Sequence, residues 1–386
     1  MKGTRMTADF DLIISGGTVV DPSQGLHGLH DIAIKSGRIV GVGAYEASMG
    51  ASVLDARGLI VTPGIVDMHV HVYEGVSHYG VDADENCIHK GVTTVLDAGS
   101  SGALTFPGFR EYVIDRVHTR IFALINIATS GMISDIVGEL EDLRMADPHE
   151  TLKMLEQHRD IILGVKVRLE KRMAGENALA ALKMGREVAD AARVPIMVHI
   201  GGTVNPLTDF LPLLSAGDVM THCFHAKTYG VLDDDGAVVP EVRAAVERGV
   251  MLDIGHGRGG FSFDVCRKAI GQGLNPSTIS SDIHTHNIHG PVFDMATTMS
   301  KFLHLGFELD DVVRMTSVDP ARAMGMPDGI GTLSDGAPAD VSLFELRHGA
   351  FDFVDALDAH ETAERRLIPY AVVRDGRAHA AIVDYA

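Results

Sequence analysis

Histidines and an aspartate stand near the ends of short apolar runs in the middle of the sequence. His69 and His71 are two positions apart in GIVDMHVHV, His199 lies in VPIMVHIG, His222 in DVMTHCFH and Asp282 in STISSDIH. If these runs are strands, His69 and His71 share one face, because alternate side chains of a strand point the same way. Imidazoles and carboxylates that converge from several strands are ligands for a divalent metal. The pattern therefore predicts a metal site.

Lys166 lies inside another apolar run, LGVKVRL, with valine on both sides. Burial of an ammonium group is costly and lowers its pKa. A neutral amine beside metals can react with carbon dioxide to give a carbamate, an anion with two oxygens that can bridge two cations. Lys166 is therefore a candidate ligand. The alternative is a buried lysine paired with a carboxylate.

Arg168 shares the face of Lys166 and lies two residues closer to the end of the run. A guanidinium group there is suited to hold a substrate carboxylate by two parallel hydrogen bonds; the alternative is a structural salt bridge. Further candidates for substrate contact are Tyr73, His256 and His284. Asp97, which ends VTTVLDAG, could be structural or catalytic.

Any one of these histidines has an ordinary explanation. A lone histidine at a strand end is more often a hydrogen-bonded structural residue than a ligand, and His-x-His alone is a weak signal. Four separate strand ends with suitable residues make coincidence a poor explanation, so the set favours a shared site.

The elements that must position these residues alternate regularly. Between residues 63 and 327, eight short apolar runs alternate with segments such as 176–193, whose apolar residues recur at helical spacing. Eight strand–helix units over roughly 265 residues predict an α/β protein with a (β/α)8 TIM-like barrel, whose active site lies at the carboxyl ends of the strands.

The two chain ends show a different sequence pattern from the middle. Residues 1–62 and 328–386 read as short strands separated by turns, with an Asp-Gly turn between Arg374 and Arg377. We expect them to form together one small β-sandwich domain beside the barrel of residues 63–327.

The composition of the chain limits the classes of partner that we expect it to bind. The chain has 386 residues, a formal net charge of -19 and 46% apolar residues. The acidic balance argues against nucleic acid and anionic membranes as partners. Three widely spaced cysteines, no convincing signal peptide and no long apolar run predict a cytoplasmic enzyme acting on a small molecule. Self-association into a homo-oligomer is left open.

At these residues the sequence resembles the amidohydrolase superfamily. PGIVDMHVH matches the first-strand signature Pro-Gly-x-x-Asp-x-His-x-His, and TSVDPARAMGM followed by GIGTLSDGAPADVSLFE resembles the family's exit from the barrel. The resemblance implies two Zn²⁺ ions per subunit, with manganese, iron or cobalt as substitutes. Carboxylated Lys166 and a hydroxide would bridge them. The deeper ion would be held by His69, His71 and Asp282, and the more exposed one by His199 and His222.

The implied mechanism is attack by the bridging hydroxide on a substrate carbonyl, with Asp282 as general acid and base. Dihydroorotases of the family usually carry an arginine where this chain has Tyr73, and deaminases usually lack the bridging lysine. LGVKVRL, VHIGGT, THCFHAKTYG and SSDIHTHN resemble instead a dihydroorotase-like branch of deacetylases that act on acylated hydroxy or amino acids.

We therefore expect a deacetylase of a small carboxylate-bearing substrate. A cyclic amidase of dihydroorotase or hydantoinase type is the alternative. A non-enzymatic barrel scaffold is a third reading, but such proteins typically lose ligands, and all six ligand positions are filled here.

Overall fold

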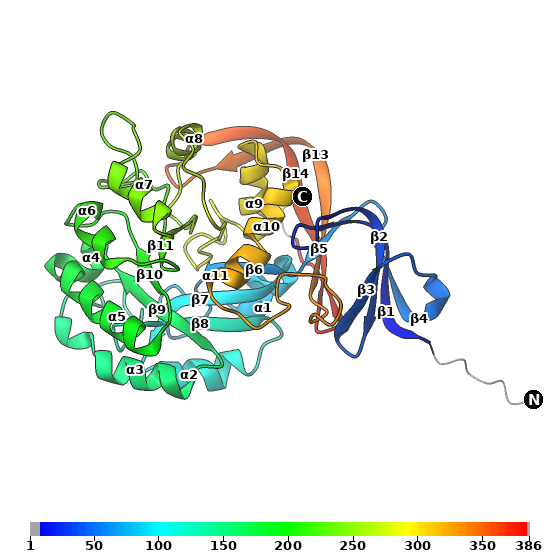
Figure 1. The fold of residues 1–386 in the computed structure, drawn as a ribbon, viewed down its shortest axis with the longest axis horizontal. Helices are drawn as coiled ribbons and strands as arrows, with labels where there is room; N and C mark the ends of the chain where they lie inside the picture. The colour runs from blue at the N-terminus through cyan, green and yellow to red at the C-terminus, as the bar shows by residue number, and fades with distance from the viewer. Residues whose placement is uncertain (1–7, 384–386) are drawn as a thin grey trace, which may run out of the picture.

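The computed structural model describes residues 8–383; residues 1–7 and 384–386 of the two predicted chain-end segments lie outside the described residues. The central sheet within this range has seven parallel strands, each paired with the next along the chain (Figure 1). Its strands are β6 (Ile65–Val70), β7 (Val92–Gly102), β8 (Arg120–Asn126), β9 (Ile162–Arg168), β10 (Ile196–His199), β11 (Val219–Thr221) and β12 (Met251–Asp253).

The eighth predicted strand, STISSDIH, does not form a regular strand. Single parallel bridges join Thr278 to Asp253 of β12 and Ile283 to Val70 of β6, so the segment still closes the barrel. Within this segment Asp282 adopts a left-handed backbone with φ 49°, which departs from the extended conformation of a strand. The backbone N–H of Asp282 nevertheless donates to the carbonyl of His69 at 2.7 Å, which fixes the segment against β6.

Helices cover the outside of the sheet, as the alternating pattern predicts. The longest is α5, and its small buried face packs on β9: a Cβ at Gly185 would lie 2.6 Å from a methyl group of Val167. The helices are α1 (Ala83–Asn86), α2 (Phe106–Phe109), α3 (Pro148–Gln157), α4 (Lys171–Ala174), α5 (Ala178–Ala192), α6 (Leu207–Phe210), α7 (Pro240–Glu247), α8 (Phe263–Gly271), α9 (Met295–His304), α10 (Leu309–Met315) and α11 (Val318–Ala323). In the described part of the chain no helix is long and apolar enough to cross a membrane.

The two chain ends form one β domain, as predicted, and its strands belong to a single mixed sheet in the order β15-β14-β13-β5-β1-β2-β3, with β4 paired to β1. They are β1 (Phe10–Asp21), β2 (Leu26–Lys35), β3 (Arg38–Gly43), β4 (Gly50–Asp55), β5 (Ile60–Pro63), β13 (Val341–Val354), β14 (His360–Arg374) and β15 (Arg377–Ala380). The chain leaves this sheet at Pro63 and enters the barrel sheet at Ile65, and the predicted turn joins β14 to β15.

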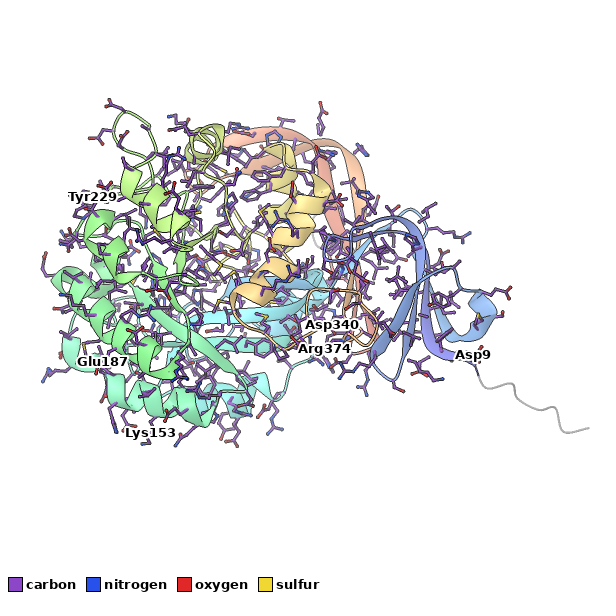
Figure 2. The ribbon with its side chains drawn as sticks, viewed as in Figure 1. Asp9, Lys153, Glu187, Tyr229, Asp340 and Arg374 are labelled. Carbon is purple, nitrogen blue, oxygen red and sulfur yellow. The ribbon has the colours of Figure 1, made fainter. Side chains whose placement is uncertain are left out.

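The long β13–β14 hairpin reaches from the β domain over the barrel, where it runs beside α9 (Figure 1). The backbone N–H of Leu367 on β14 donates to the Ser300 hydroxyl of α9 at 2.9 Å. At the junction of barrel and β domain, where Figure 2 labels Asp340 and Arg374, Arg120 forms an ion pair with Asp340. The hairpin therefore ties the end of the chain to the barrel.

Candidate active site

A cavity of about 370 Å³ opens at the carboxyl ends of the barrel strands. All six predicted metal ligands contribute to its wall. They lie in β6, β9 and β10, directly after β6 and β11, and in the segment that closes the barrel: His69, Lys166, His199, His71, His222 and Asp282.

The six side chains point at one another. Asp282 Oδ1 lies 3.4 Å from His69 Nε2 and 3.2 Å from His71 Nε2. Ligand atoms of His69, His222 and Asp282 all lie within 4.8 Å of one another. His222 Nε2 is 3.0 Å from His199 Nδ1. The cluster therefore presents a carboxylate and several imidazole nitrogens to one small volume.

Hydrogen bonds behind the cluster set the direction of each imidazole. The Thr221 hydroxyl donates to a carboxylate oxygen of Asp253 at 2.7 Å, so its oxygen accepts from His69 Nδ1–H at 2.8 Å. His222 Nδ1–H donates to the carbonyl of Gly255 at 2.6 Å. Both rings thus turn an Nε2 lone pair toward the cluster, the arrangement that metal-binding histidines need.

His71 is held by its own pair of residues. Its Nδ1 lies 2.9 Å from the Ser100 hydroxyl, and Asp97 accepts from the backbone N–H groups of Val72 and Ser100 at 2.9 and 2.7 Å. The open question about Asp97 thus has a structural answer, because its carboxylate holds the backbone that carries Ser100.

Burial shapes the charges of the cluster. It lowers the pKa of His69, His199 and His222 well below the ordinary histidine value, and nearby cationic groups add to the effect. Burial also lowers the pKa of Lys166 to about 7, against the attraction of Asp282, and raises the pKa of Asp282 to about 6. The imidazoles are therefore neutral, as ligands must be.

The residues fit a divalent cation. Asp282 Oδ1 is buried and has no hydrogen-bond partner among the described residues, although two imidazole nitrogens face it. A carboxylate beside inward lone pairs is unfavourable unless a cation lies between them. Lys166 Nζ contacts His69 Nε2 at 3.4 Å and Met197 Sδ at 3.3 Å. Within residues 8–383 no carboxylate lies within 4 Å of that Nζ, which disfavours the alternative of a simple ion pair.

Two of the four predicted substrate contacts line the cavity, namely Arg168 and His284. The other two do not. The Tyr73 hydroxyl donates to the carbonyl of Thr105 at 3.1 Å, and its ring stacks on Phe109. His256 is fully buried and turned away from the cavity. We therefore give neither Tyr73 nor His256 a role in binding substrate.

Arg168 has neighbours that sequence reasoning missed. Its side chain is 3% exposed, its Nη1 lies 3.4 Å from Glu139 Oε1, and its Nη2 donates to the Tyr79 hydroxyl at 3.3 Å. Glu170 also lines the cavity, 3.5 Å from His199 Nε2. The alternation that relates Lys166 to Arg168 extends to Glu170 and could have found it.

The wall of the cavity is rich in positive charge, although the whole protein carries a net charge of -19. Two carboxylates, Glu170 and Asp282, face the cavity. Apart from Lys166, four cationic side chains line it: Arg168, Arg172, Lys227 and Arg258. This excess attracts anionic ligands.

A (β/α)8 barrel whose strand ends converge histidines, a lysine and an aspartate defines the class of metal-dependent barrel hydrolases. Residues 60–378 match the amidohydrolase family, and the chain belongs to it. The predicted family and the predicted metal-dependent hydrolase are both confirmed. Members of this family bind divalent metals, in keeping with the cluster of His69, His222 and Asp282.

Individual relatives carry different activities. A deacetylase from Agrobacterium fabrum is 35% identical over 340 residues, which cover 87% of this chain and 83% of that protein. The crystal structure of an adenine deaminase matches with a TM-score of 0.90 and 30% identity, over 96% of this chain and 100% of the other. That of a dihydroorotase matches with a TM-score of 0.87 and 33% identity, over 96% and 98%. Membership of the family alone therefore does not fix the reaction of this chain.

Proposed function

We propose that this protein is a binuclear deacetylase that hydrolyses the acyl ester or amide of a small carboxylate-bearing substrate, an O- or N-acetylated hydroxy or amino acid. The observation that carries the proposal is the cationic wall around the ligand cluster, with the buried Arg168 beside Lys166. A cavity of about 370 Å³ suits a small substrate. The deacetylase relative supports the reaction.

Two divalent cations at the cluster, zinc by preference and bridged by carboxylated Lys166, would supply Lewis acidity and a hydroxide nucleophile near neutral pH. His69, His71 and Asp282 would hold one cation, and His199 and His222 the other. The remaining chemistry belongs to side chains of this protein.

Asp282 is placed to move the proton. Burial raises the pKa of Asp282 to about 6, so its carboxylate can take a proton from the nucleophile and return it to the leaving oxygen or nitrogen. Arg168 would bind the substrate carboxylate. Its Nη1 lies 3.4 Å from Glu139 Oε1 and its Nη2 donates to Tyr79, but a guanidinium group has five N–H donors, so donors remain for an acceptor that enters the cavity.

The main alternative is a cyclic amidase of dihydroorotase or hydantoinase type, supported by the dihydroorotase structure. Dihydroorotate also carries a carboxylate, so the charge of the cavity does not separate the two reactions. Tyr73 occupies the position at which dihydroorotases usually carry an arginine, and it packs away from the cavity. An acyclic acyl substrate is therefore favoured. Adenine has no anionic group for the cationic wall, which disfavours deamination.

The proposal is tested by a substrate panel. The metal-loaded protein is assayed for acetate release from O-acetyl and N-acetyl derivatives of α-hydroxy and α-amino acids. Dihydroorotate, hydantoin and adenine are run beside them. We expect turnover of at least one acetylated acid, with a KM well below that of its matched neutral carboxamide. Turnover of dihydroorotate, hydantoin or adenine alone would overturn the proposal.

A further inference from the structure

Lys301 on α9 is a second buried lysine, and the mechanism does not use it. Its side chain is fully buried, and its Nζ lies within hydrogen-bond distance of three acceptors. They are His256 Nε2 at 2.8 Å, the carbonyl of Pro291 at 2.8 Å and the carbonyl of Val354 at 2.7 Å. An ammonium group has three donors, so Lys301 uses all of them.

The three acceptors belong to three separate segments. His256 lies in the loop after β12, residues 255–260, which we call the β12 loop. Pro291 precedes α9, and Val354 begins the hairpin tip, residues 354–359. The tip also contacts the chain just beyond the β12 loop, because the N–H of Ala356 donates to the carbonyl of Phe261 at 3.1 Å. Lys301 thus links the C-terminal hairpin to the wall of the cavity, which Gly259 and Gly260 help to form.

The contact with Lys301 fixes the state of the His256 ring. Burial lowers the pKa of His256 well below its ordinary value, and the charge of Lys301 adds to the effect, so the ring is neutral. The carbonyl of Gly257 can only accept, so His256 Nδ1–H donates to it at 3.0 Å, and Nε2 is left to accept from Lys301 Nζ at 2.8 Å. The ring therefore couples Lys301 to the backbone of Gly257.

Gly257 lies directly against Asp282. Its backbone is left-handed, with φ +52°, and a Cβ there would lie 2.2 Å from Asp282 Oδ2. Its N–H donates to the carbonyl of Ser281 at 3.0 Å, one residue before Asp282. The Asp282 carboxylate thus rests on the backbone of the β12 loop.

We propose that Lys301 is a positioning residue for Asp282, which it orients through His256 and Gly257. The inference rests on the proposed function, because it takes Asp282 as the group that moves the proton. Asp282 Oδ1 accepts no hydrogen bond from residues 8–383 and its backbone is left-handed, so packing of the carboxylate against the β12 loop helps to set its direction. A small displacement of a catalytic group is costly to the rate.

Three variants test the contact of Lys301 with His256 and the contact of His256 with Gly257. Lys301→Met keeps the length of the side chain and removes all three bonds. His256→Asn places an amide where the Nδ1 atom was, so it keeps the bond to Gly257 and loses Lys301. His256→Gln places a carbonyl near the position of Nε2, so it keeps Lys301 and loses the bond to Gly257. Arg267→Met is the matched control: it cuts the ion pair to Glu361 of β14, another link between barrel and hairpin, without touching the β12 loop.

The metal-loaded variants are compared in kcat, KM, metal content and hydrogen–deuterium exchange of residues 255–260. We expect Lys301→Met and both His256 variants to lower kcat about 10- to 100-fold, the range for residues that orient metal-site groups. KM and metal content should stay within about twofold of the wild-type values, because the substitutions change neither the metal ligands nor Arg168. Exchange should rise in the β12 loop, and Arg267→Met should change none of these quantities.

Unchanged kcat in the His256 variants would overturn the inference, even if Lys301→Met fails to fold. An equal loss of kcat in Arg267→Met would also overturn it, because general loosening of the hairpin would then be the cause. If the wild-type protein hydrolyses no acetylated acid, the proposed function fails, and exchange alone decides the present inference. Faster exchange of residues 255–260 in Lys301→Met but not in Arg267→Met would then support it, and equal exchange in all proteins would overturn it.

Discussion

Replacing Arg168 by methionine should separate substrate recognition from stability, because this guanidinium serves both. Its Nη1 lies 3.4 Å from Glu139 Oε1, and the two side chains are 3% and 4% exposed. Arg168→Met removes the donor for a substrate carboxylate and leaves the Glu139 carboxylate buried without its cation.

The two losses have different sizes. Hydrogen bonds to charged groups contribute about 1.5–3 kcal/mol. At about 1.4 kcal/mol per tenfold, KM for the acetylated acid should rise about 10- to 100-fold, with little change in kcat. Removal of one partner of a buried ion pair costs about 3–5 kcal/mol of unfolding free energy. Arg168→Met should therefore be both less stable and weaker in binding.

A second substitution separates the two effects. In the double variant Arg168→Met, Glu139→Gln, no charge is left unpaired, so most of the unfolding free energy should return while KM stays high. KM is measured with an acetylated acid and with its neutral carboxamide, and stability by urea denaturation. If Arg168→Met left KM for the acid unchanged, or raised it equally for acid and carboxamide, Arg168 would have no role in carboxylate recognition.

Three further perturbations test the site. Thr221→Val removes the hydroxyl that holds His69 Nδ1 at 2.8 Å and should weaken metal binding about 10- to 100-fold in a chelator competition; unchanged affinity would contradict the supporting role. Asp282→Asn should lower kcat about 10²- to 10⁴-fold, and a loss of less than tenfold would remove Asp282 from proton transfer. Burial lowers the pKa of Lys301 from 10.5 to about 7. Between these values the unfolded chain binds more protons than the folded protein, so this group makes stability rise with pH, by up to about 1.4 kcal/mol per pH unit. Urea denaturation from about pH 7.5 to 9.5 should show a shallower slope in Lys301→Met than in the wild type, and parallel slopes would contradict the lowered pKa.

The convergence of the six candidate ligands was predictable because these residues lie in strands or directly after them. Within a strand the side chains alternate, so His69 and His71 had to share a face, as did Lys166 and Arg168. The same rule extends to Glu170, which the sequence interpretation overlooked. The barrel and the joining of the chain ends also followed from the pattern of short runs and turns.

The residues that sequence reasoning misplaced lie in loops, where side chains do not alternate between two faces as they do in a strand. His256 is flanked by Gly255 and Gly257, whose φ values of 46° and 52° turn the chain, so the ring faces Lys301 instead of the cavity. Tyr73 lies beyond the end of β6, and the ring that reaches the cavity is Tyr79. No periodicity relates those two positions, because the path of the loop depends on contacts distant in sequence, such as that of the His78 N–H with the carbonyl of Met132.

In the proposed site, Lys166 as a carbamate bridges two cations. The most direct test of this bridge is elemental analysis of the purified wild-type protein and of Lys166→Ala, both prepared with zinc or manganese and bicarbonate. We predict about two metal equivalents per chain in the wild type, as a bridged binuclear site requires, and a clear fall in the variant. No metal in the wild-type protein under these conditions, or equal content in both proteins, would contradict the bridged site.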